Sequence, residues 1–232
     1  MNQALTEAME DYLKTIYHLH EESVVYGDAT RATTTQAVAE SLKVAPPSAT
    51  AMIKKLAALD LVTHTPYRGV ELTPNGQKAA LEIVRHHRLS ETFLAQIMGI
   101  GWDKAHQEAD KWEHVLSEEV EERMAALLGH PTHDPHGAPI PLVDGQMPSE
   151  SLHQLSRIEA GQNAVVRRVH DEDAALLRYL KEVGVVPGTA VEVVRANPSE
   201  GVLELHIEGR TLILGLIPAA AILVEAQEKE TA

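Results

Sequence analysis

The stretch HQEADKWEHVLSEEVEERM, residues 106–124, carries side chains that could bind a divalent metal ion. On a helical wheel that starts at His106, the residues Asp110, Glu113 and His114 all lie within about 80° of that first residue. This polar group borders the apolar stripe of the same predicted helix, so its members would be partly buried. Carboxylates are costly to bury alone, and a divalent cation is one good partner for them. The alternative interpretation is a solvated acidic helix face with a hydrogen-bonded histidine.

Further imidazole and carboxylate groups lie on the helix predicted before this block. His87 and Glu91 are four residues apart and therefore share one helix face. The residues suggest two ligand groups, one of His87, Glu91 and His106 and the other of Asp110, Glu113 and His114. A rise of 1.5 Å per residue places two such sites on the order of 6–12 Å apart. Bridged two-metal catalysis requires roughly 3.5–4 Å, so separated sites favour metal sensing over hydrolysis.

Asp11 is a candidate ligand from the first predicted helix. Apolar residues repeat at helical spacing over residues 5–20, and Asp11 lies about 200° from Met9, on the side away from the core. If Asp11 joins the second ligand group, a metal ion would connect this first helix to the later ones. An exposed surface acid is the alternative.

The first third of the chain predicts a winged helix-turn-helix. Residues 33–44 fit a short helix, and a second helix follows Pro46, because proline is tolerated in a first turn. The segments LVTHT and GVELT alternate in polarity around a short turn, which indicates a β-hairpin. The second helix would enter the major groove of DNA. The expected contacts are hydroxyl hydrogen bonds, apolar contacts to thymine methyl groups and phosphate contacts, from Pro47, Ser48, Thr50, Ala51, Lys54 and Arg68.

The remainder predicts two long helices, residues 77–98 and 103–128, followed by a loop that begins at Gly129 and a polar tether. The two helices carry more apolar surface than a monomer needs, which indicates a dimer interface. Five short strands and one helix near residues 172–183 then predict a small β-barrel. The expected organisation is a DNA-binding domain over 1–75, a helical metal-binding and dimerisation domain over 76–143, a linker over 144–160 and a barrel over 161–232.

The composition restricts the possible partners and metal ligands. The 232-residue chain has a formal net charge of −14, which taken alone argues against nucleic acid. The charge is uneven, because residues 31–70 hold five basic and two acidic residues, whereas residues 99–150 hold three basic and eleven acidic ones. The chain has no cysteine, so oxygen and nitrogen atoms must hold any metal. No signal sequence or long apolar run is present, which predicts a soluble, cytoplasmic protein without a membrane partner.

Several motifs together resemble the DtxR/MntR-type metal-dependent transcriptional repressors. These motifs are MEDYLKTIYHL, PPSATAMIKKLAALDLV, YRGVELTPNG, HHRLSETFL, DKWEHVLSEEVEERM and HPTHDPHGAPIP. The resemblance covers nearly the whole chain. Within this family the chain is similar to the long, manganese-type members. It implies a mainly α fold with a small β part: a winged helix-turn-helix, a helical dimerisation domain and a C-terminal FeoA-like barrel of the Src-homology-3 type.

The resemblance also implies two metal sites. The primary site would comprise Asp11, Asp110, Glu113 and His114, and the ancillary site would comprise His87, Glu91 and His106, with Asp171 as a further ligand. In iron-type members a methionine stands at the Asp11 position and a cysteine at the Asp110 position. Carboxylates in their place harden the site, which favours Mn²⁺, with Fe²⁺ as the alternative and Zn²⁺, Cd²⁺ or Co²⁺ binding in vitro. Manganese-type members carry a glutamate where this chain has Lys14, and an ammonium cannot bind a metal ion.

The implied function is metal-dependent repression of metal-uptake genes. Divalent cation binding would fix the geometry of a homodimer for a palindromic operator in double-stranded DNA. No enzymatic activity, small organic substrate or membrane partner is expected. Two other hypotheses are kept: a carboxylate–histidine metalloenzyme such as a metal-dependent hydrolase, and a ligand-binding regulator without a metal.

Overall fold

The computed structural model describes residues 5–26, 33–65, 69–171, 173–197 and 199–227. The chain divides into two compact units, each assembled from separate segments. The first unit comprises Met1–His87, Lys111–Glu121 and Pro141–Pro148, and the second comprises Arg88–Asp110, Glu122–Ile140 and Ser149–Ala232.

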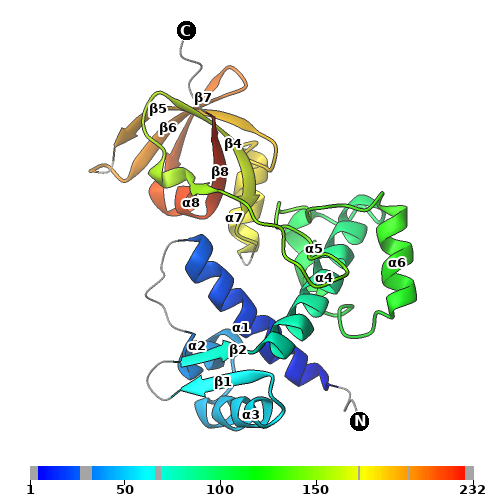
Figure 1. The fold of residues 1–232 in the computed structure, drawn as a ribbon. Coiled ribbons are helices and arrows are strands. Elements are labelled where there is room, and N and C mark those ends of the chain that lie inside the picture. Colours follow the sequence, from blue (N-terminus) through cyan, green and yellow to red (C-terminus); the bar gives the residue numbers. More distant parts are fainter. Residues whose placement is uncertain (1–4, 27–32, 66–68, 172, 198, 228–232) are drawn as a thin grey trace. The chain divides into compact units, whose positions relative to one another are not determined.

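The first unit begins with the helix–helix–hairpin order that the sequence predicts (Figure 1). Its elements are α1 (Glu7–Val25), α2 (Thr35–Ser41), α3 (Pro46–Ala58), β1 (Val62–Thr65), β2 (Gly69–Leu72) and the first half of α4 (Pro74–Gln96). The side chain of Thr34 caps α2 by accepting a hydrogen bond from the Ala37 amide, and Pro46 occupies the first turn of α3. The hairpin is antiparallel, with Val62 opposite Leu72.

The core of the first unit lies where α1, α2 and α3 meet. Leu13 and Ile16 of α1 and Ile53 and Leu56 of α3 are each at most 1% exposed. The helix α3 ends at Ala58, and Leu59, which follows as its cap, is 39% exposed.

The predicted single helix over residues 103–128 is wrong. The structure has α5 (Trp102–Ala109) and α6 (Glu118–Leu127), with turns and irregular backbone between them. In a continuous helix the carbonyl of Glu113 would accept a hydrogen bond from the amide of residue 117. Here that carbonyl contacts Nδ1 of His86 on α4 at 3.1 Å. Ser117 caps the start of α6, because its hydroxyl accepts a hydrogen bond from the Val120 amide, and three acidic residues follow in the first turn. A tertiary contact thus replaces a helical one.

The second unit contains a six-stranded antiparallel sheet. Its strands are β3 (His153–Gln154), β4 (Gln162–Val169), β5 (Ala190–Asn197), β6 (Val202–Ile207), β7 (Arg210–Gly215) and β8 (Ile222–Gln227), in the order β3-β8-β4-β5-β6-β7. The helix α7 (Ala174–Glu182) follows β4, and the short helix α8 (Leu216–Ala220) precedes β8. The sheet curves around its own apolar core, as Figure 1 shows. The predicted small β-domain and its five strands are confirmed, whereas β3 and α8 were not predicted.

The proline- and histidine-rich loop over residues 130–140 is held against β4 in the same unit. Oδ1 of Asp134 accepts hydrogen bonds from the amides of His136 and Ala138, which closes a tight turn. Gly137 has a φ of +88°, and a Cβ atom there would lie 1.8 Å from the carbonyl oxygen of Arg167. Only glycine therefore allows the loop to approach the strand this closely.

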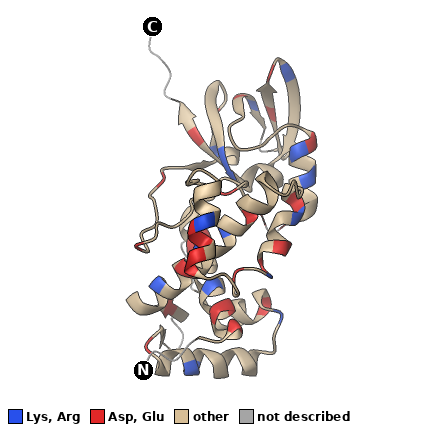
Figure 2. Cartoon of the chain, turned by 90° about the vertical axis from the view of Figure 1, so that its right-hand side faces the viewer, with Lys and Arg blue, Asp and Glu red and all other residues tan. Residues whose placement is uncertain are grey.

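Negative charge is concentrated in the helical middle of the chain. Figure 2 shows acidic residues gathered in the part that includes α6, whose first turn holds Glu118, Glu119 and Glu121. Within the described residues, no helix is both long enough and apolar enough to cross a membrane.

Candidate metal centres

The first unit brings Asp11, Glu113 and His114 together. Asp11 comes from α1, and the other two residues come from the segment between α5 and α6. One ligand atom from each residue lies within 4.8 Å of the others, which is close enough for one metal ion to bind all three. Nε2 of His114 lies 3.0 Å from Oδ1 of Asp11 and 3.4 Å from Oε1 of Glu113. We call these three residues the first cluster.

Glu113 is the buried member of the first cluster, with 2% of its surface exposed. Its Oε2 atom lies 2.5 Å from Nδ1 of His87, and the ammonium of Lys14 lies 2.6 Å from Oε1 and 2.8 Å from Oε2. Burial by itself would raise the pKa of Glu113, but His87 and Lys14 outweigh it, so the pKa lies below its ordinary value. Glu113 is therefore an anion.

His114 is surrounded by carboxylates. Its Nδ1 atom lies 2.7 Å from Oε2 of Glu10, which fixes the ring and turns Nε2 toward Asp11. Burial alone would lower the pKa of His114, but Glu10, Glu113 and Asp11 raise it above its ordinary value. A metal ion that binds this imidazole must therefore displace a proton.

The first cluster borders a cavity of about 770 Å³ within the first unit. Glu10, Glu113 and His114 line it together with Lys78 and Glu82.

A second group of ligands lies in the second unit, and we call it the second cluster: Glu91, Asp134, His136 and Asp171. Their ligand atoms also lie within 4.8 Å of one another. Nδ1 of His136 lies 3.7 Å from Oε1 of Glu91 and 4.0 Å from Oδ2 of Asp171. The opposite nitrogen of this ring, Nε2, donates a 2.9 Å hydrogen bond to the Trp102 carbonyl, and the Trp102 ring stacks on the imidazole. The ring orientation therefore presents Nδ1 to the carboxylates.

The second cluster has the electrostatics of a cation site. Oδ2 of Asp134 and Nδ1 of His136 are buried and have no hydrogen-bond partner. Burial and the neighbouring Glu91 raise the pKa of Asp134 to about 6. Burial opposes the charge on His136, but Glu91, Asp134 and Asp171 raise its pKa to about 10. Arg88 lies 3.7 Å from Oδ2 of Asp134 and offsets part of the buried negative charge. Three carboxylates and one imidazole are nevertheless a donor set that a divalent cation fits.

The structure places the remaining candidate ligands as follows. Nδ1 of His106 lies 3.0 Å from Oε1 of Glu91 and 3.9 Å from Oδ2 of Asp171, at the edge of the second cluster. His87, which the resemblance groups with Glu91 and His106, contacts Glu113 in the first unit. Asp110 is exposed and caps the C-terminal end of α5. The metal ligands remain a prediction.

Sequence reasoning did not find Asp134 and His136. Both lie in HPTHDPHGAPIP, whose prolines predict a loop rather than a helix. A carboxylate and an imidazole two residues apart in a proline-restricted loop were the available signal. Their place beside Glu91 depends on the packing of Gly137 against β4.

The residues expected to contact DNA lie on the outer side of α3. Pro47, Ser48, Ala51 and Lys54 are exposed, and Oγ1 of Thr50 donates a hydrogen bond to the carbonyl of Pro46. Arg68 lies outside the described residues.

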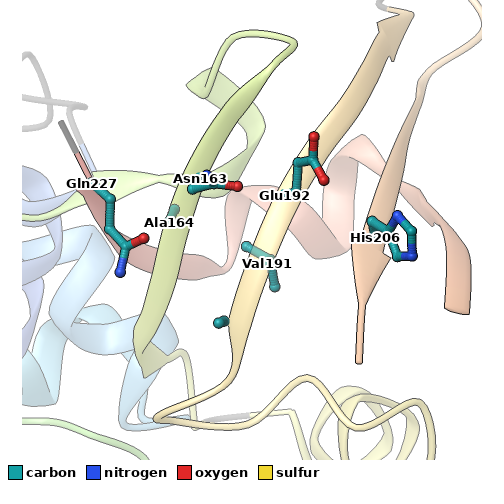
Figure 3. Close-up of a pocket in the computed structure, with 7 residues that line it drawn as sticks. Asn163, Ala164, Val191, Glu192, His206 and Gln227 are labelled. Carbon is teal, nitrogen blue, oxygen red and sulfur yellow. The ribbon is translucent and has the colours of Figure 1, made fainter. Parts of the chain in front are cut away.

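A further hollow of about 270 Å³ lies on the sheet of the second unit (Figure 3). Gln227, Asn163, Glu192 and His206 form a row across it, each opposite the next on neighbouring strands. Among the seven residues that line the hollow, Glu192 and His206 are the two with metal-ligating side chains, which is too few for a metal site.

Family models match three parts of the chain. Residues 4–70 match "Iron dependent repressor, N-terminal DNA binding domain", and residues 73–142 match "Iron dependent repressor, metal binding and dimerisation domain". Residues 153–226 match the FeoA domain. The first cluster thus joins residues of the DNA-binding part to residues of the metal-binding part.

Relatives cover most of the chain. The "Iron-dependent repressor IdeR" of Mycobacterium leprae is 36% identical over 211 residues, which are 86% of this chain and 88% of that protein. The "Diphtheria toxin repressor" of Corynebacterium glutamicum is 33% identical over 201 residues, which are 82% of this chain and 85% of that protein.

Solved structures of metal-dependent repressors are similar to this chain in sequence and fold. A "Manganese-dependent transcriptional repressor complex with manganese" is 37% identical, with a TM-score of 0.87 over 94% of this chain and 100% of that chain. "Crystal Structure of ScaR with bound Zn2+" is 32% identical, with a TM-score of 0.76 over 94% of this chain and 98% of that chain. The chain therefore belongs to the DtxR/MntR-type family of iron-dependent repressors and is a metal-dependent, DNA-binding transcriptional repressor.

Proposed function

We propose that this repressor responds to Mn²⁺, with Fe²⁺ as the alternative, and that it represses genes for metal uptake. The choice of metal rests on the donor set. The first cluster offers carboxylate oxygens and an imidazole nitrogen, and the chain has no cysteine. Hard oxygen donors suit manganese, whereas sulfur donors favour softer metals. Zn²⁺, Cd²⁺ and Co²⁺ would bind the same residues in vitro.

The observation that carries the proposal is the first cluster itself. Asp11 lies on α1, which packs against α3 in the core of the DNA-binding part, whereas Glu113 and His114 lie in the segment that precedes α6. A bound divalent cation would take these three closely spaced groups as ligands at the same time. Asp11, Glu113 and His114 would then fix α1 to this segment, with His87 holding Glu113 and Asp110 as a further ligand. The second cluster would hold a second ion.

Operator binding would follow from the fixed position of α1. We propose that the chain acts as a homodimer through its helical part and that two α3 helices read the halves of a palindrome. Pro47, Ser48, Thr50 and Ala51 would contact base edges, and Lys54 and Arg68 would contact phosphates. We propose no catalytic role and no small organic substrate, because the two clusters are explained by metal sensing.

Fluorescence anisotropy with a palindromic DNA duplex tests the proposal. The duplex is enriched from random sequence by the full chain in the presence of Mn²⁺. Mn²⁺ should raise the DNA affinity of the wild type by roughly 5–150-fold, the usual range of allosteric coupling. Asp11→Ala should lose this effect, whereas Glu7→Ala, which removes an exposed acid from the same helix, should keep it. Equal DNA binding with and without Mn²⁺ in the wild type would disprove the proposal.

The metalloenzyme hypothesis makes a different prediction. A hydrolase would turn over esters or phosphates in the presence of Mn²⁺, whereas a regulator would not. Turnover that His114→Ala abolishes would favour the enzyme.

A further inference from the structure

Lys14 presents a positive charge inside the first cluster. It lies three residues after Asp11 on α1, so the two side chains share one face of the helix. Its ammonium lies 2.6 Å and 2.8 Å from the two carboxylate oxygens of Glu113. The side chain of Lys14 is 14% exposed and that of Glu113 is 1% exposed, so this ion pair is largely shielded from solvent.

Glu113 has little remaining capacity for another cation while this ion pair is intact. Lys14 contacts both of its oxygens, and His87 also contacts Oε2. A divalent cation binds carboxylate oxygens at roughly 2.0–2.6 Å. It would therefore share an oxygen with the ammonium of Lys14 at a distance where two positive charges repel strongly, in a site with little solvent to screen them.

We propose that Lys14 is a tethered cation that competes with the divalent metal for Glu113 and thereby sets the metal concentration at which the repressor responds. This inference rests on the proposed metal-dependent function. In the metal-free protein Lys14 neutralises the buried carboxylate and holds α1 beside residues 111–117. Metal binding requires the ammonium to leave Glu113, and the long flexible side chain of Lys14 allows it to move into solvent.

The two cations hold different sets of residues. The ammonium group of Lys14 contacts Glu113, whereas the carboxylate of Asp11 contacts His114. A metal ion would bind all three residues of the first cluster at once. Asp11 therefore contacts the segment before α6 in both forms, whereas the contact of Lys14 with Glu113 would be lost when the metal ion binds.

Calorimetric titration with Mn²⁺ tests the competition. Lys14→Met keeps the length of the apolar stem and removes the charge, so Mn²⁺ should bind roughly tenfold more tightly or better, within the usual range of coupling between two ligands. Lys14→Arg retains the charge and should bind Mn²⁺ close to the wild-type affinity. Lys78→Met removes a lysine that lines the neighbouring cavity without a contact to Glu113, and it should change the affinity less than about twofold.

Chemical labelling of the wild type gives a second measurement that requires no variant. The reactivity of each lysine amine toward an acylating reagent is measured by mass spectrometry on the full chain, with and without saturating Mn²⁺. Lys14 should be protected without Mn²⁺ and become several-fold more reactive with it, while the exposed Lys54 and Lys181 stay unchanged.

The outcomes separate this inference from the proposed function. If the wild type binds Mn²⁺ but Lys14→Met binds it no more tightly and Lys14 stays protected, the ion pair is only structural and the inference is wrong. If Lys14→Met does not fold, the labelling result decides alone. If the wild type binds no Mn²⁺ at all, the proposed function fails, and the inference fails with it.

Discussion

The Nδ1 atom of His86 donates a 3.1 Å hydrogen bond to the backbone oxygen of Glu113. Its Nε2 atom lies 3.0 Å from Oε2 of Glu121, which also contacts Arg85. Both ring nitrogens therefore face acceptors, so the ring must carry both protons and a positive charge. This charged ring holds the turn that carries the first cluster against α4.

The His86–Glu121 pair should make stability depend on pH. Burial alone would lower the pKa of His86, but Glu121 and the Glu113 carbonyl raise it above its ordinary value, and His86 lowers the pKa of Glu121. The contribution of His86 is complete below about pH 6.5 and is lost as the pH rises through its raised pKa. The contribution of Glu121 is complete above about pH 4.5 and is lost as the pH falls through its lowered pKa.

His86→Gln should therefore lower the free energy of unfolding by about 1–2 kcal/mol at pH 6 and by less at pH 9. Urea titrations at the two pH values measure the difference. His64→Gln, which changes an exposed histidine of β1, should show no such dependence. An equal loss for His86→Gln at both pH values would contradict a charged His86.

Loss of His136 should remove one metal ion per chain. His136→Ala deletes the imidazole of the second cluster and leaves the first cluster unchanged, so the Mn²⁺ stoichiometry should fall from two to one per chain. Calorimetry and elemental analysis of dialysed protein both report this number. His133→Ala, in the same loop but with a side chain 43% exposed, should still bind two ions. Two ions in His136→Ala would exclude the second cluster as a metal site.

Gly137 should be far more sensitive to substitution than Gly129, although both have positive φ angles. Gly129→Ala meets no atom within 4 Å, so the expected cost is about 1–2 kcal/mol from the backbone conformation alone. Gly137→Ala also drives its Cβ into the Arg167 carbonyl and should cost roughly 3 kcal/mol or more. It should also weaken Mn²⁺ binding at the second cluster, since Asp134 and His136 would shift. Similar unfolding free energies for the two variants would contradict the close approach.

Lys54→Ala should weaken DNA binding without changing its sequence preference. Each phosphate contact adds roughly 0.9 to the slope of log affinity against log salt, so this slope should decrease by about that amount. Fluorescence anisotropy at salt concentrations between about 50 and 200 mM measures this slope. Lys181→Ala, on α7, serves as the control and should leave the slope unchanged. An unaltered slope for Lys54→Ala would show that this lysine makes no phosphate contact.

Elements with local signals can be predicted from the amino-acid sequence. Proline at the start of α3 and alternating polarity around the hairpin are properties of short segments. The helix–helix–hairpin order and five of the six strands of the C-terminal sheet could therefore be predicted. The residue types of the first cluster could also be selected, because carboxylates and imidazoles at the edge of an apolar stripe are costly without a partner.

Tertiary contacts decided how those ligands are presented. Residues 110–117 have no proline or glycine to break a helix, and the helix ends because His86, His87 and Lys14 bind Glu113. The second cluster likewise forms because Gly137 lets a loop approach β4 and bring Asp134 and His136 beside Glu91. Such contacts join residues far apart in the chain, so the periodicity of a short segment does not predict them. The sequence therefore determined which groups could hold a metal ion, and packing decided which of them meet.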